Sequence, residues 1–267
     1  MRATAKEAIS TNTTITYEQP VTEYTRLYLR LEFLFSQLEQ TIGQTTVDSS
    51  KMAMDHILKL INVTDRPDIK SKLTQTLTQQ SSHLKQLQKI PEVNAEALNH
   101  LLSEIDNHIQ TLHKNLSRVG DGIRKNEFLS QIRSQLHNPA GACRHTAPAF
   151  YLWLRKPPEE RNKDLTEWLS ELNDLKQCIS LVLKLIREST PMQEVSCQKG
   201  FFQQTLDSNQ SIELLRITLP IQYNLYPEFS VSKHRVNIRF LHPTYYDIGR
   251  SEQSHKNFHF MLACCKL

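Results

Sequence analysis

Residues 214–219 read Leu-Leu-Arg-Ile-Thr-Leu, and residues 235–240 read Arg-Val-Asn-Ile-Arg-Phe. In both stretches apolar and polar side chains alternate, as in a β-strand with one face on a core and the other in water. Residues 258–262 continue this pattern, and Phe201–Leu206 carries a weaker form of it. Sequential strands joined by loops form an antiparallel sheet. We therefore expect an antiparallel β domain over residues 191–267.

Before Pro191 the apolar residues recur with the period of a helix. One buried stripe is formed by Leu27, Leu31, Leu34, Leu38 and Ile42. Comparable stripes predict helices over about 50–62, from Asp65 to Pro91, from Asn94 to about 116, near 128–136, and from about 164 to 188. In the second of these, an Asp cap and Pro67 in the first turn mark the start. The fold class is therefore α+β, with a helical bundle domain over 21–190 followed by the smaller β domain.

The N-terminal residues follow neither period. Residues 1–14 are rich in Thr, Ser and Ala, which predicts a loose tail. Residues 15–20, Ile-Thr-Tyr-Glu-Gln-Pro, alternate and stop at a proline, which predicts a short edge strand that joins the sheet. The helices between 66 and 116 pair as a hairpin whose nearly heptad stripe is either bundle core or an interaction arm. We favour core.

The composition excludes several function classes. The six glycines form no phosphate-binding loop, which excludes Rossmann and P-loop nucleotide binding. The five cysteines lack zinc spacing and are odd in number, and we find neither a signal peptide nor a membrane-length apolar stretch. We expect a cytoplasmic protein with reduced thiols.

Catalytic patterns are also missing. None of the eleven histidines has metal-ligand spacing, and no serine sits in a nucleophile elbow. Cys143, followed by Arg144 and His145, resembles an activated thiol, but neighbouring residues seldom point at one another. We therefore expect no enzyme activity, no metal and no cofactor.

The sequence instead places positive charge. With 32 Lys and Arg against 28 Asp and Glu, the net charge is +4. Arg235 and Arg239 share the non-core face of one strand, and we expect Arg216 to join them from its own strand. Arg26 and Arg30 stack at i, i+4 on the first helix. These arginines form either a solvated face or a binding face for an acidic peptide, a nucleic acid or an anionic membrane. A small net charge without interleaved aromatic residues weakens the nucleic-acid interpretation.

Ordered segments along residues 15–265 resemble the Z-ring-associated protein D (ZapD) family. They are Ile15–Pro20, Arg26–Leu34, Asn138–Cys143, Tyr151–Leu154, Leu183–Ser189, Gly200–Phe202, Leu225–Pro227, Arg235–Phe240 and Leu262–Cys265. The resemblance implies a non-enzymatic, dimeric cell-division factor at the mid-cell ring, which binds the C-terminal tail of the tubulin-like protein FtsZ and bundles its filaments. It implies that the basic site includes Arg26, Arg66, Arg235 and Arg239, of which Arg66 follows from the resemblance alone. A nucleic-acid-binding protein that uses the same basic face is the alternative.

Overall fold

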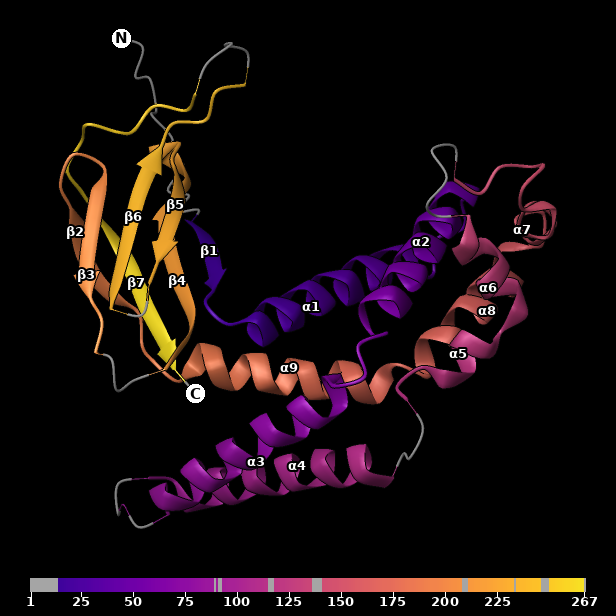
Figure 1. The fold of residues 1–267 in the computed structure, drawn as a ribbon, viewed down its shortest axis with the longest axis horizontal. Coiled ribbons are helices and arrows are strands. Elements are labelled where there is room, and N and C mark those ends of the chain that lie inside the picture. The colour runs from indigo at the N-terminus through magenta and orange to yellow at the C-terminus, as the bar shows by residue number, and fades with distance from the viewer. Residues whose placement is uncertain are drawn as a thin grey trace, which may run out of the picture. The chain divides into compact units, whose positions relative to one another are not determined.

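The computed structural model describes residues 14–88, 90, 93–114, 118–135, 141–207, 211–232, 234–245 and 250–266. These residues form helices and two antiparallel sheets (Figure 1), which confirms the α+β class. The predicted tail over 1–14 lies almost wholly outside the described residues. Residues Tyr24–Leu185 form one compact unit, and β1 together with the residues from Ile186 onward forms a second.

The helical unit is built on amphipathic helices. They are α1 (Glu23–Thr41), α2 (Val47–Val63), α3 (Ile69–Leu87), α4 (Ala95–Lys114), α5 (Asp121–Lys125), α6 (Glu127–Ser134), α7 (Pro148–Trp153), α8 (Pro158–Ser170) and α9 (Asn173–Glu188). The predicted α1 stripe is buried from Leu27 to Leu38, and Leu31 and Leu38 are fully inaccessible to solvent. Ile42, the last residue of the predicted stripe, follows the end of α1 and is half-buried. None of the helices in the described ranges is both long and apolar enough to cross a bilayer.

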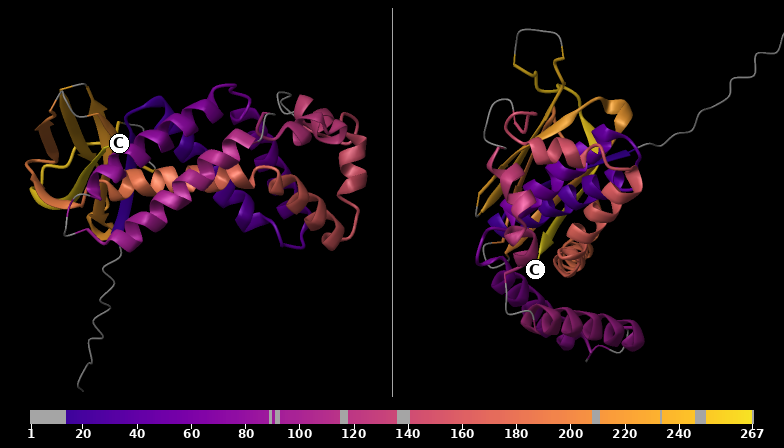
Figure 2. Two further views of the ribbon diagram at one scale, coloured as in Figure 1. Left: turned by 90° about the horizontal axis from the view of Figure 1, so that it is seen from below. Right: turned by 90° about the vertical axis from the view of Figure 1, so that its right-hand side faces the viewer.

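Helices α3 and α4 form the predicted hairpin and lie side by side in every view (Figures 1 and 2). Leu73 and Leu77 of α3 are buried, as are Leu98, Leu102 and Ile105 of α4. The apolar stripe therefore serves as core at these positions.

Two helix boundaries were predicted wrongly. The single helix predicted over 164–188 is two helices, α8 and α9. The backbone makes a tight turn between them, in which the Leu172 N–H donates to the Leu169 carbonyl at 2.9 Å. The apolar stripe keeps its phase across this break, so the pattern does not reveal it. The helix expected from Asp65 starts at Ile69, and Pro67 precedes its first turn. The Asp65 carboxylate is instead held by two arginines.

The β unit contains two sheets where a single sheet was expected. One has the order β1 (Thr14–Pro20), β4 (Ile212–Pro220), β7 (Phe258–Lys266), β2 (Gln193–Cys197). The other has the order β3 (Phe201–Thr205), β6 (Arg235–Leu241), β5 (Tyr226–Val231). The inward side chains of both sheets share one core, and the rings of Phe240 and Phe260 meet across it at 4.9 Å. The unit is therefore a sandwich, with β1 as the predicted edge strand.

The chain passes from one sheet to the other between β2 and β3. Lys199 and Gly200 make this turn with φ angles of +48° and +67°. A Cβ atom on Gly200 would lie 2.2 Å from the Ser254 carbonyl oxygen, so only glycine fits there. This turn connects β2, an edge strand of the first sheet, to β3, an edge strand of the second.

Candidate partner-binding surface

The central strand β6 places two of the predicted arginines on an outward face. Val236, Ile238 and Phe240 are fully buried, whereas Arg235 and Arg239 are exposed. Residues paired across the ladders share this face, because side chains directly opposite one another point the same way. We call this surface the β6 face; it consists of Phe201, Gln203 and Thr205 of β3, Arg235, Asn237 and Arg239 of β6, and Glu228 and Ser230 of β5.

Charge and apolar surface meet on the β6 face. Arg239 forms an ion pair with Glu228 on one side and faces Phe201, which is 38% exposed, on the other. Arg235 makes no side-chain hydrogen bond or ion pair with another described residue. The Asn237 Oδ1 atom is buried and has no hydrogen-bond donor within the described part of the chain. The face therefore offers cationic donors beside an accessible ring.

A hollow of about 850 Å³ adjoins Arg239. Two cationic residues, Lys199 and Arg239, line it together with Phe201 and the uncharged polar residues Ser196, Gln198, Gln203, Gln253 and Asn257. No described lining residue carries a carboxylate. A hollow with this lining suits a ligand that carries negative charge.

Lys199 is a residue that the sequence reasoning missed. Its N–H donates to Asn257 Oδ1 at 2.8 Å, and its carbonyl accepts from Gln253 Nε2 at 2.9 Å. These bonds fix the backbone of the turn at the rim of the hollow. The available signal was Gly200, which directly follows Lys199, because glycine is the residue that most readily forms a turn with positive φ.

Arg216 does not join Arg235 and Arg239. Its Nε donates to Glu18 Oε1 at 3.0 Å. Arg187 donates to both oxygens of the same carboxylate, from Nε to Oε1 and from Nη2 to Oε2, each at 2.8 Å. Burial alone would raise the pKa of Glu18, but the hydrogen bonds and charges of Arg187 and Arg216 hold it below its ordinary value. Because β4 and β6 belong to different sheets that share one core, their outward faces lie on opposite sides of the sandwich.

The remaining predicted arginines belong to the helical unit. Arg26 and Arg30 are exposed on α1 and make no side-chain hydrogen bond or ion pair within the described ranges. The guanidinium of Arg66 lies 5.7 Å from the centre of the Tyr24 ring, and its Nε lies 3.6 Å from Asp68. Tyr24 donates its hydroxyl to that same carboxylate at 2.6 Å. Arg26, Arg30 and Arg66 thus lie in the helical unit, whereas the β6 face lies in the β unit.

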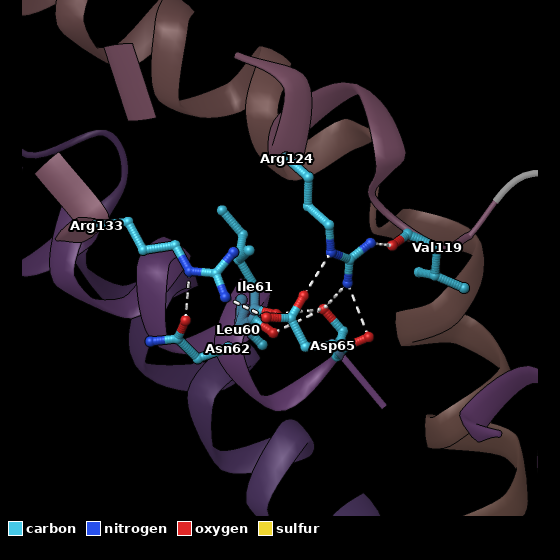
Figure 3. Close-up of polar contacts among 8 residues, drawn as sticks. Leu60, Ile61, Asn62, Asp65, Val119, Arg124 and Arg133 are labelled. Atoms are coloured by element: carbon cyan, nitrogen blue, oxygen red, sulfur yellow. Dashed lines mark hydrogen bonds and ion pairs between the residues drawn. The ribbon is translucent and has the colours of Figure 1, made fainter. Parts of the chain in front are cut away.

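Two further arginines of this unit serve the fold. Arg124 Nε donates to Asp65 at 2.8 Å, and Arg133 binds the other oxygen of the same carboxylate (Figure 3). Arg124 also donates to Thr64, and Arg133 donates to Asn62 at 2.6 Å. Burial would raise the pKa of Asp65, yet the two arginines keep it below its usual value. This network ties α5 and α6 to the end of α2.

Cys143 differs from the expectation that it would not meet His145. Its Sγ lies 3.2 Å from His145 Nδ1 and 3.2 Å from Thr146 Oγ1. The hydrogen bond from Thr146 is the main cause that lowers the pKa of this partly exposed thiol. The other four cysteines have raised pKa values, chiefly through burial.

Comparisons with known proteins agree along almost the whole chain. The family model described as ZapD, cell division protein, matches residues 29–239. A cell division protein ZapD of Coxiella burnetii (strain RSA 493 / Nine Mile phase I) is 45% identical over 255 residues, which cover 96% of this chain and 99% of the relative. That of Chromobacterium violaceum is 31% identical over 252 residues, with 94% and 99% covered. With matches of this extent, the chain belongs to the ZapD family of cell division proteins.

Proposed function

We propose that this protein binds the C-terminal tail of FtsZ and cross-links FtsZ filaments at the division ring, without catalysing a reaction. The observation that carries the proposal is the β6 face, where Arg235 and Arg239 stand beside the exposed ring of Phe201. A tail segment with carboxylates and one or two apolar residues matches such a surface in charge and in chemistry.

The proposed capture is mainly electrostatic. An exposed ion pair contributes about 0–1 kcal/mol, so one tail on one face binds weakly. Arg239 already pairs with Glu228, so part of its charge is compensated before a tail arrives. Weak single contacts leave the attachment reversible.

Cross-linking needs at least two such faces in one particle. A homodimer supplies them, and a filament supplies many tails. Linked binding events of this kind raise the apparent affinity by about 10² to 10⁴ without a new contact. We therefore propose a cytoplasmic homodimer that bundles filaments at mid-cell.

The nucleic-acid alternative receives less support from the geometry. Arg216 lies in a different sheet, where it pairs with Glu18, so the β6 face keeps two arginines instead of three. Of these, Arg239 is paired with Glu228. Backbone binding to nucleic acid depends on many phosphate contacts, which this face does not supply.

Co-sedimentation with GTP-assembled FtsZ filaments tests the proposal. We expect the protein to pellet with full-length FtsZ and to stay in the supernatant with FtsZ that lacks its tail. Arg235→Asp and Arg239→Asp should each lower the pelleted fraction at least about fivefold, because each variant replaces an attraction by a repulsion.

The matched control is Lys163→Asp on α8, an exposed cation of the helical unit that changes the net charge equally. It should pellet as the unmodified protein does. If both arginine variants keep their circular dichroism spectra and still bundle filaments, the β6 face is not the binding surface. If the unmodified protein does not pellet with full-length filaments, the proposed function is wrong. A mobility-shift assay with oligonucleotides then tests the nucleic-acid alternative.

A further inference from the structure

Strand β3 has an open edge. It pairs with β6 on one side, and no strand of the described residues pairs along its other side beyond Phe201. The Gly200 carbonyl accepts from the Phe240 N–H, and the Leu206 N–H donates to the His234 carbonyl, both at 2.8 Å. In an antiparallel ladder such bonded positions alternate, so the even-numbered residues of β3 bond to β6. The backbone N–H and C=O groups of Gln203 and Thr205 therefore point away from the sheet.

The sandwich is also open along this edge. Gln204 lies opposite the buried Val236 and so belongs to the core side of β3, yet it is exposed. Beside it lies a second hollow of about 350 Å³, whose lining includes Val195, Phe202, Leu262, Cys264, Gln204 and Lys266. Phe202 lines both this hollow and the one next to Arg239, so the two follow the same edge.

Strand β3 lacks the usual protection of an edge. Its sequence, Phe-Phe-Gln-Gln-Thr, contains no charged residue and no proline, and its pairing with β6 runs without a bulge. Edge strands that avoid pairing normally carry such features. Its one protective feature is its length of five residues.

We propose that β3 accepts an extended segment of the FtsZ tail as a fourth strand of its sheet. This inference rests on the function proposed above and specifies how the tail is held. Side chains on one face of the added strand would enter the second hollow, and those on its other face would reach the β6 face. The residues that line the two hollows include Lys199, Arg239 and Lys266 and no described carboxylate. The segment that fits best therefore alternates apolar and acidic residues.

Hydrogen exchange of the unmodified protein tests this pairing directly. The probe is a synthetic peptide of the FtsZ C-terminal tail, and the readout is amide exchange resolved by NMR. The amides of Gln203 and Thr205 should exchange at least about tenfold more slowly when the peptide is bound, because they gain hydrogen-bond acceptors. The amides of Phe202 and Gln204 already face β6 and should change little.

A proline tests the same point through binding. Gln203→Pro removes an N–H that the fold does not use, at an edge position where proline is tolerated. It should bind the peptide at least about tenfold more weakly than Gln203→Ala, which removes the same side chain but keeps the backbone donor. The amide spectrum shows whether each variant is folded; if the proline variant is not, the exchange experiment decides.

The outcomes separate this inference from the proposed function. If the peptide binds and neither Gln203 nor Thr205 becomes protected, strand addition is wrong while tail binding stands. If the peptide does not bind the unmodified protein, both are wrong. If these amides become protected without peptide as the protein concentration rises, the edge pairs with a second copy of the chain, and the inference is overturned.

Discussion

At the scale of single residues, Cys143 shows how local geometry sets reactivity. Its thiol is partly exposed, and its Sγ lies 3.2 Å from Thr146 Oγ1, whose hydrogen bond lowers the pKa of the thiol. The thiolate is the reactive form of cysteine, and a lowered pKa increases its fraction at neutral pH. In contrast, burial raises the pKa of Cys178 to about 12.

We therefore expect iodoacetamide to modify Cys143 first. Peptide mapping by mass spectrometry should show one fast site in the folded protein, and Cys143→Ser should abolish it. Thr146→Val, which removes the hydroxyl at nearly constant volume, should slow the reaction by a factor of roughly three or more. Faster labelling of Cys264, whose pKa is raised by burial, would show that the thiol pKa does not control the order.

Residue patterns also decided how much of the candidate site could be predicted. The alternation placed Arg235 and Arg239 outward and Val236, Ile238 and Phe240 inward, as the structure has them. It could not reveal Lys199, because a turn residue has no period. Nor could the alternation show that Arg216 forms an ion pair with Glu18, because the two residues are far apart in the sequence.

At the scale of elements, the Glu18 carboxylate joins three parts of the β unit. It lies on the edge strand β1, Arg216 lies on β4, and Arg187 lies in the last turn of α9, the part of that helix that belongs to the β unit. The three side chains are partly buried, with 19% of the Glu18 side chain and 24% of each arginine side chain exposed. Loss of the carboxylate would leave two partly buried cations without their partner, which costs more than the pair itself contributes.

Glu18→Gln should therefore lower the free energy of unfolding by about 1–2 kcal/mol at neutral pH. The folded-state pKa of Glu18 lies below the unfolded value, so its stabilisation is present above the unfolded pKa. It is lost as the pH falls through the folded pKa. Urea unfolding at a series of pH values should show the two proteins converging in acid.

The control for this prediction is Glu194→Gln on β2, an exposed carboxylate in the same unit. Its unfolding free energy should stay within about 0.5 kcal/mol of the unmodified protein. A constant difference between Glu18→Gln and the unmodified protein down to the lowest pH would mean that the ionised carboxylate is not what stabilises this junction.

Most elements were easier to predict than their pairing, although strands β2 and β5 were not predicted. A period of two marks a strand and gives its inward face, but it is the same whichever sheet the strand joins. From this period we predicted one sheet. In the structure, the tight turn at Lys199 and Gly200 places β2 and β3 in different sheets. In the helical unit, the stripe that stays in phase from Leu165 to Ile179 hid the break between α8 and α9 for the same reason.

At the scale of the whole molecule, the proposed function requires binding that is weak at one site and strong in an array. The β6 face supplies exposed cations, whose attraction to a tail is screened by salt. We expect a labelled FtsZ tail peptide to bind the free protein weakly. Its affinity should fall roughly fivefold to tenfold as ionic strength rises from about 0.1 M to about 0.5 M.

Assembled filaments should bind far more tightly than the peptide. If each dimer carries two β6 faces, the apparent dissociation constant for filaments should be lower than that for the peptide by a factor of about 10² to 10⁴. Fluorescence anisotropy measures the first constant and co-sedimentation the second, with tail-truncated filaments as the control. Equal constants would mean that one face acts at a time, and a protein that engages one tail at a time cannot hold two filaments together.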